Sequence, residues 1–71
     1  MKYFRRMRDL REDHDFTPTT VAHFLGVRPQ QYQLYESGRR NFPLWMILRL
    51  ADLYGVSVDY LLGRTDDPLP P

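Results

Sequence analysis

The side chains best suited to chemistry cluster between Arg28 and Asn41. Three glutamines, Gln30, Gln31 and Gln33, fall in this segment, and each amide both donates and accepts hydrogen bonds. Such an amide can pair with adenine, whereas an arginine can bind a phosphate oxygen. The segment is therefore equipped to contact a nucleic acid, although glutamines also simply keep exposed helices soluble.

Charge is distributed unevenly along the chain, although the formal net charge is only +1. From residue 51 onward, four aspartates face the single cation Arg64. A chain with one basic side and one acidic end can bind phosphate locally while staying near neutral overall. Randomly scattered surface charge is the other explanation. The cations that form the basic side are Lys2, Arg5, Arg6 and Arg8 in residues 1–8, and Arg28, Arg39 and Arg40 in residues 28–40, where Glu36 is the only acid.

No catalytic or metal-binding pattern accompanies these residues. His14 and His23 have no second ligand at the three- or four-residue spacing of a helical metal site, so we expect surface histidines. Asp66 and Asp67 lie near the C-terminal prolines, where we expect no pocket to shift their pKa values. We therefore expect no enzyme activity, no metal and no cofactor.

Length and composition limit the class of protein further. The 71 residues suffice for one small domain, and the absence of cysteine means that packed helices must stabilise its core. The most apolar run, residues 42–48, is far shorter than the roughly 20 residues that span a membrane. The charged N-terminus leads into no apolar signal segment. These features predict a soluble cytoplasmic protein with no membrane partner.

Apolar residues recur at helical spacing almost everywhere, and no run alternates as a half-buried strand would. The first expected helix carries Phe4, Met7 and Leu10 on its apolar face, and Thr17 caps the second. Residues 64–71 contain three prolines and two aspartates, so we expect them to form a flexible tail after a domain of residues 1–63. The five expected helices cover about residues 3–13, 18–24, 29–37, 43–54 and 58–62.

The fourth expected helix is apolar on more than one side. We expect Trp45 and Met46 to fall off its inner line and to form an exposed apolar patch. The sequence leaves two interpretations of this patch open: a contact between two copies of the chain, or a cover for the helix end or the preceding loop. The expected inner line consists of Leu44, Ile47, Leu48, Leu50, Ala51 and Tyr54.

The strongest local pattern is helix, tight turn, helix. Where two helices cross closely, a small residue must sit at the contact and the turn needs a residue that tolerates positive φ. Ala22 and Gly26 supply these properties. Tyr32 and Tyr35 are spaced to point back into the domain. The face left free for a DNA major groove is Gln30, Gln31, Gln33 and Leu34.

In this order and spacing, the motifs resemble those of the phage-repressor and Cro type of helix-turn-helix protein, also called XRE-type. The resemblance covers nearly the whole chain, from about Arg5 to Gly63. It implies an all-α, compact five-helix bundle of the lambda-repressor-like class, acting as a sequence-specific transcriptional regulator and repressor. The motifs that carry the resemblance are Leu10-Arg11, Thr17, Val21-Ala22, Leu25-Gly26-Val27, Tyr35-Glu36-Ser37-Gly38-Arg39-Arg40, Leu50-Ala51 and residues 56–63.

The resemblance also implies roles for individual residues. Arg11 on the first helix would form a structural salt bridge with Glu36 at the end of the third helix, which is the DNA-recognition helix in this family. The alternative is that the two are merely solvated surface charges. Bases would be read by Arg28, Pro29, Gln30, Gln33 and Leu34. Phosphates would be bound by Thr17, Thr19, Gln31, Arg39, Arg40 and Asn41. For the adjacent arginines, simple solubility is the alternative.

Two positions depart from the family pattern. Pro18 stands where the family commonly has a glutamine that binds phosphate, and proline has neither an N–H nor a polar side chain. The hydroxyls of Thr17 and Thr19 could replace this anchor. Tyr32 stands where an aliphatic residue is usual, so its hydroxyl must lie near solvent or a partner.

The resemblance implies a double-stranded DNA operator as the partner, in the nucleoid of the cytoplasm, and no small-molecule substrate is evident. One half-site gives little affinity, so we expect a homodimer on two half-sites about 34 Å apart. The alternative function is a protein-interaction module, such as an antitoxin-like or immunity-type adaptor, that turns the same face of the bundle to another protein.

Overall fold

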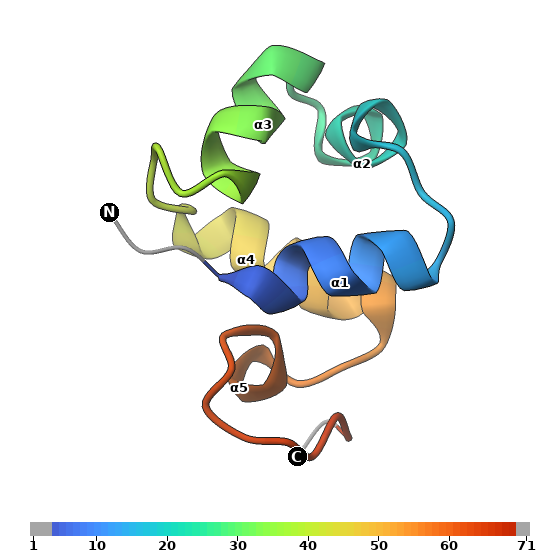
Figure 1. Cartoon of the computed structure of the whole chain (residues 1–71), viewed down its shortest axis with the longest axis vertical. Helices are drawn as coiled ribbons and strands as arrows, with labels where there is room; N and C mark the ends of the chain where they lie inside the picture. The colour runs from blue at the N-terminus through green and yellow to red at the C-terminus, as the bar shows by residue number, and fades with distance from the viewer. Residues whose placement is uncertain (1–3, 70–71) are drawn as a thin grey trace.

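The structure, a computed structural model, describes residues 4–69. The described residues form helices and contain no strand, so the expected all-α fold is confirmed (Figure 1). The first helix was expected from residue 3, which lies outside the described residues. The helices are α1 (Arg5–Asp13), α2 (Pro18–Leu25), α3 (Pro29–Glu36), α4 (Leu44–Tyr54) and α5 (Val58–Leu61).

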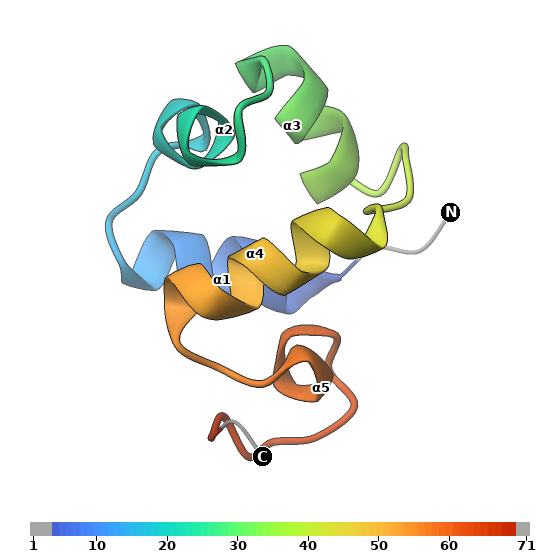
Figure 2. The same cartoon turned by 180° about the vertical axis from the view of Figure 1, so that it is seen from behind.

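The helices lie in three levels (Figures 1 and 2). α1 and α4 occupy the middle level in both views, α2 and α3 lie together on one side of them, and α5 lies on the opposite side. This arrangement supports α3 from below and leaves its other side open. The core that joins the levels includes the fully buried residues Met7, Val21, Tyr32, Met46, Leu50 and Leu61.

The turn between α2 and α3 is built as the sequence predicted. Oγ1 of Thr17 accepts a hydrogen bond from the backbone N–H of Thr20 at 3.1 Å, which caps the start of α2. Gly26 ends α2 with a φ of 77°, in the left-handed region, and the N–H of Val27 closes the turn on the carbonyl of Ala22 at 3.0 Å. The close turn therefore sets the angle between α2 and α3.

The expected faces of α4 are wrong at three positions. Met46 was expected on an exposed patch but is fully buried, whereas Leu44 and Leu48 were expected to face inward but are 68% and 48% exposed. Residues two apart on a helix are separated by about 200°, so Leu44 and Leu48 must lie opposite a buried Met46. Trp45, at 46% exposed, is on the outer face as expected. The inner line consists of Met46, Ile47, Leu50, Ala51 and Tyr54.

The segment expected to form a tail makes specific contacts over its described part, residues 64–69. The guanidinium of Arg6 on α1 donates to the carbonyl oxygens of Tyr60 at 2.8 Å and Thr65 at 2.7 Å. The N–H of Ser57 donates to the carbonyl of Pro68 at 3.0 Å. No side chain in residues 64–69 is buried, so the segment lies against the domain without joining its core.

Candidate nucleic-acid interface

The outward face of α3 is polar and open. Gln30, Gln31 and Gln33 are all exposed, as the sequence predicted, while Tyr32 is fully buried and Tyr35 is half-buried. Nε2 of Gln31 lies 3.4 Å from the hydroxyl oxygen of Tyr35, to which it donates. The other two glutamines, Gln30 and Gln33, line the same hollow in the surface.

Two shallow hollows flank Gln33. The first has a volume of about 360 Å³ and is lined by residues of α1, the start of α2 and α3; the second has a volume of about 270 Å³ and lies along α3. Gln33 and Ser37 line both hollows. The first is also lined by Arg8, Arg11, Pro18 and Glu36, and the second by Gln30, Leu34 and Arg39. The second hollow thus brings together three predicted base-reading residues and one predicted phosphate ligand.

The exposed charges of residues 28–41 are all positive. In residues 28–41, the exposed charged side chains are Arg28, Arg39 and Arg40, and the one acid, Glu36, is buried. Arg28 is the residue that precedes α3, and its side chain makes no capping hydrogen bond. The backbone N–H of Arg40 donates to the carbonyl of Leu34 at 3.0 Å, which folds the arginine loop back against the end of α3.

The predicted pair of Arg11 and Glu36 is formed in the structure. Nε of Arg11 donates to Oε1 of Glu36 at 2.8 Å, and Nη1 donates to the carbonyl of Phe16 at 2.8 Å. The side chains are only 12% and 9% exposed. Burial by itself lowers the pKa of Arg11. The hydrogen bond to Glu36 and the negative charge of Glu36 raise this pKa by more than burial lowers it, so the net change is upward. This pair joins the end of α3 to α1.

Tyr32 does not meet the expectation for its hydroxyl, which was to lie near solvent or a partner. The hydroxyl oxygens of Tyr32 and Tyr54 are both buried, and neither has a hydrogen-bond partner among the described residues. Burial, followed by the negative charge of Glu36, raises the pKa of both hydroxyls. The ring of Tyr32 fills the core below α3, with the Phe42 ring centroid 6.5 Å away.

The remaining predicted phosphate ligands lie at two edges of this surface. Thr17 and Thr19 are exposed at the start of α2, where the hydroxyl of Thr17 is also 3.0 Å from that of Thr20. Pro18 lines the first hollow between them. Asn41 is exposed in the loop that precedes α4. The structure therefore leaves α3 between two sets of possible phosphate ligands.

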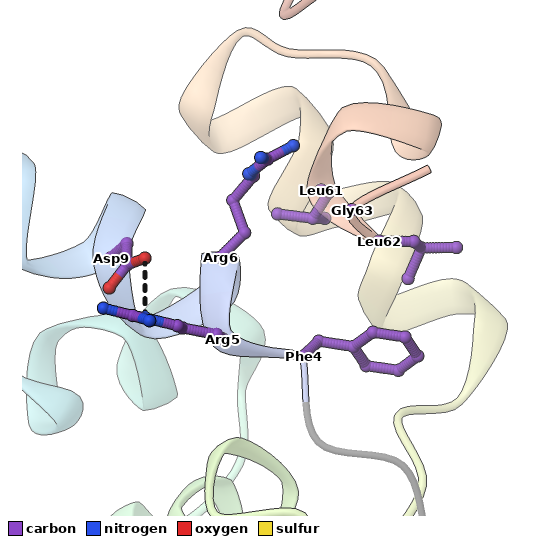
Figure 3. Close-up of a pocket in the computed structure, with 7 residues that line it drawn as sticks. All are labelled: Phe4, Arg5, Arg6, Asp9, Leu61, Leu62 and Gly63. Carbon is purple, nitrogen blue, oxygen red and sulfur yellow. Dashed lines mark ion pairs between the residues drawn. The ribbon is translucent and has the colours of Figure 1, made fainter. Parts of the chain in front are cut away.

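The described arginines of the basic N-terminal segment do not all line the surface around α3. Figure 3 shows a pocket of about 210 Å³ between α1 and α5, lined by Arg5 and Arg6, in which Arg6 extends toward α5. Nε of Arg5 lies 3.6 Å from Oδ2 of Asp9, and the guanidinium of Arg6 lies 4.1 Å from the ring centroid of Tyr60. Arg8 alone of these three lines the first hollow, and Lys2 lies outside the described residues.

Two residues of the site were missed from sequence. Ser37 follows Gln30 by seven residues and Gln33 by four, and Arg8 precedes Arg11 by three. These spacings place residues on the same side of a helix, so helical periodicity would have found both. Within residues 4–69, no group of three or more histidine, aspartate or glutamate side chains could hold a metal ion.

Together, three features define a small helix-turn-helix domain. They are the α2–α3 helix pair, the Arg11–Glu36 ion pair that joins α3 to α1, and the exposed arginines of residues 28–41. A family model described as a helix-turn-helix domain matches residues 5–62. The chain therefore belongs to the helix-turn-helix family, and the XRE type indicated by its motifs is confirmed.

Several named proteins are similar to the chain. The uncharacterized HTH-type transcriptional regulator YobD of Bacillus subtilis is 44% identical over 68 residues, which is 96% of this chain and 61% of the relative. HTH-type transcriptional regulator AnsR of the same organism is 37% identical over 59 residues, covering 83% of this chain and 51% of the relative. The cryptic phage CTXphi transcriptional repressor RstR of Vibrio cholerae is 33% identical over 61 residues, covering 86% and 55%.

The chain thus spans between about half and three fifths of the length of these relatives. No solved structure matches it at a significant level. In the part of the chain that the structure describes, no helix is long and apolar enough to cross a membrane.

Proposed function

We propose that this chain binds double-stranded DNA sequence-specifically, as a transcriptional repressor acting at the nucleoid, with α3 in the major groove. The observation that carries the proposal is the second hollow, where Gln30, Gln33, Leu34 and Arg39 meet on an exposed face. A helix of about 10–12 Å diameter fits a major groove of about 12 Å width. The named relatives support a role in transcription, since RstR is called a repressor and YobD and AnsR are called regulators.

Different parts of the surface have different roles in this proposal. Gln30, Gln33 and Leu34 read base edges, helped by Arg28 and Pro29 at the start of α3. A second group of residues binds phosphates and therefore carries no sequence information. It consists of Thr17, Thr19, Gln31, Arg39, Arg40 and Asn41.

The test compares substitutions in the two groups. A preferred site is first selected from random DNA, and affinities for this site and for random DNA are then measured at several salt concentrations. Gln30→Ala should weaken binding to the preferred site by about 1–3 kcal/mol and change binding to random DNA little. Gln31→Ala, its matched neighbour, should weaken both equally.

The salt dependence tests the arginine loop. Arg39→Gln and Arg40→Gln should each lower the slope of log affinity against log salt by about one unit, because each removes one phosphate contact. Arg64→Gln, an exposed arginine beside Asp59, is the control and should leave the slope unchanged. Equal losses on both DNAs for Gln30→Ala would contradict base reading, and no binding at any salt would favour a protein partner instead.

A homodimer is part of the proposal. Two half-sites about 34 Å apart need two copies of α3, and the outer face of α4 offers an apolar surface for their contact. This face, which we call the α4 patch, consists of Leu44, Trp45 and Leu48. Sedimentation over a range of concentrations tests it, and a monomer at the highest concentration would contradict it.

A further inference from the structure

The first hollow, which residues of α1, the start of α2 and α3 line, has the composition of an anion site. It has a volume of about 360 Å³ and opens on the surface of the molecule. Two guanidinium groups and one carboxylate line it, and the rest of its lining is uncharged, so positive charge is in excess. The lining residues are Arg8, Arg11, Glu36, Pro18, Gln33 and Ser37.

Of the two arginines in this hollow, Arg8 is the one available to a ligand. Arg11 is only 12% exposed and donates to Glu36 and to the carbonyl of Phe16. The side chain of Arg8 is 58% exposed, and within residues 4–69 its one hydrogen bond runs from Nε to Oε1 of Glu12 at 3.0 Å. A guanidinium has five N–H donors in a planar fork, so most donors of Arg8 remain for a second, negatively charged partner.

The position of the first hollow indicates which anion it meets. Gln33 lines this hollow and also the second hollow, where Gln30 lies. Phosphates of both strands border the major groove, so a cation beside a side chain that reads bases is well placed to contact a phosphate. Each of the two hollows beside Gln33 has one exposed arginine, Arg8 in the first and Arg39 in the second.

The α2 side of the first hollow has no donor of its own. Pro18 is the residue of α2 that lines the hollow, and a proline has neither an N–H nor a polar side chain. An anion in this hollow therefore depends on α1 for charge. Arg8 supplies that charge from an exposed position on α1.

We propose that Arg8 is a further phosphate ligand, which binds one phosphate of the DNA backbone at the first hollow and leaves Glu12 to do so. The assignment rests on the proposed DNA-binding function. The pair of Arg8 and Glu12 is more than half exposed on both sides, and such pairs stabilise a protein little, so the exchange of partners costs little. A guanidinium can donate two parallel hydrogen bonds to one phosphate.

The salt dependence of DNA binding tests the contact. Arg8→Gln should weaken binding to preferred and random DNA equally, by about 2- to 10-fold, and should lower the salt slope by about one unit. Arg5→Gln is the control, because Arg5 also pairs with an acid four residues later on α1 but lines the pocket toward α5 (Figure 3). It should leave the slope unchanged. The same slope for Arg8→Gln and the unmodified chain would overturn the contact.

Neutral linkages in the DNA locate the phosphate. Phosphates of the preferred site are replaced by methylphosphonates one at a time, and the affinity is measured for each DNA. One replacement should weaken binding of the unmodified chain and of Arg5→Gln, but should leave binding of Arg8→Gln unchanged. If Arg8→Gln responds to every replacement as the unmodified chain does, Arg8 binds no phosphate.

A double-mutant cycle tests the exchange of partners. Glu12→Gln should strengthen binding to both DNAs by about 2- to 5-fold, because Arg8 then has no carboxylate to leave. In the Arg8→Gln background the same substitution should have no effect. Asp9→Asn, which removes the acid that pairs with Arg5, should change the affinities little. An equal gain from Glu12→Gln with and without Arg8 would mean that Glu12 repels DNA directly, and would overturn the exchange.

Failure of this contact and failure of the proposed function give different results. If Arg39→Gln and Arg40→Gln lower the salt slope while Arg8→Gln does not, the chain binds DNA without Arg8, and this inference alone is wrong. If the unmodified chain binds no DNA at any salt concentration, the proposed function is wrong and the phosphate contact is wrong with it.

Discussion

At the scale of single residues, the Arg11–Glu36 pair should have the largest effect on stability. Glu36 is the one charged residue of the described chain that is buried. Glu36→Ala leaves the guanidinium of Arg11, whose side chain is only 12% exposed, without its carboxylate, so we expect the free energy of unfolding to fall by about 3–5 kcal/mol. Urea denaturation of the variant and the unmodified chain measures this difference.

Glu12→Ala is the matched control for that measurement. Glu12 pairs with Arg8 at 3.0 Å, but both side chains are more than half exposed. Exposed pairs contribute about 0–1 kcal/mol, so this variant should be nearly as stable as the unmodified chain. Equal effects of the two substitutions would mean that Arg11 and Glu36 act as solvated surface charges, which is the interpretation that the sequence left open.

The buried tyrosines predict a loss of stability at high pH. The hydroxyl pKa values of Tyr32 and Tyr54 are raised above the usual value of 10.0, because burial disfavours the charged form. The unfolded chain therefore loses protons first, and the free energy of unfolding should fall as the pH rises above about 10, by about 1.4 kcal/mol per pH unit for each tyrosine.

Denaturation between pH 9 and 11.5 checks this slope. The double variant Tyr32→Phe/Tyr54→Phe should lose most of the pH dependence in this range, since phenylalanine has no proton to release. The same slope in the double variant would show that other groups cause the alkaline loss.

At the scale of helices, the ends were predictable and some faces were not. Thr17, Gly26 and Ser57 act at helix ends through local backbone geometry, which depends on a few neighbouring residues that the sequence shows directly. The outward face of α3 was also predictable, but from periodicity: its polar and aromatic residues recur at helical spacing.

α4 was misread because it is apolar almost all the way round. Its sequence offers one line through Leu44 and Leu48 and another through Met46 and Leu50, and periodicity alone favours neither. The choice depends on what α1 and α5 present to the helix, which only the folded structure shows. The environment of Tyr32 was unpredictable in the same way, since its ring packs in the core beside Phe42, which follows in a separate loop.

The α4 patch predicts the behaviour of one further variant. Trp45→Glu places a charge in the proposed contact between two copies, so it should shift the sedimenting species toward monomer and weaken binding to a full operator more than to a half-site. Leu69→Glu, at another exposed apolar residue, is the control and should leave association unchanged. If both variants associate as the unmodified chain does, the patch is not the contact.

At the scale of the whole molecule, Arg6 connects the start of α1 to the end of the described chain. Its guanidinium contacts two carbonyl oxygens and lies 3.2 Å from Oδ1 of Asp66. Arg6→Ala should lower the free energy of unfolding by about 1.5–3 kcal/mol, because hydrogen bonds to charged groups are of this strength. Thermal or urea denaturation measures the loss.

Hydrogen exchange shows whether Arg6 holds the last segment in place. The N–H of Ser57 donates to the carbonyl of Pro68, so its protection should fall in the Arg6→Ala variant. Arg5→Ala, which removes an exposed pair on the same helix, should leave this protection intact. Unchanged protection in Arg6→Ala would mean that residues 64–69 are held independently of α1.

The division of α3 into an inner and an outer side has a consequence for how such a protein evolves. Tyr32 and Glu36 anchor the helix, while Gln30 and Gln33 project from it and contribute nothing to the core. In the proposed DNA-binding role, replacing this exposed pair would change which bases α3 reads and would leave the buried contacts of the helix intact. On that proposal, related domains would change their preferred DNA sequence by replacing one outward side chain at a time.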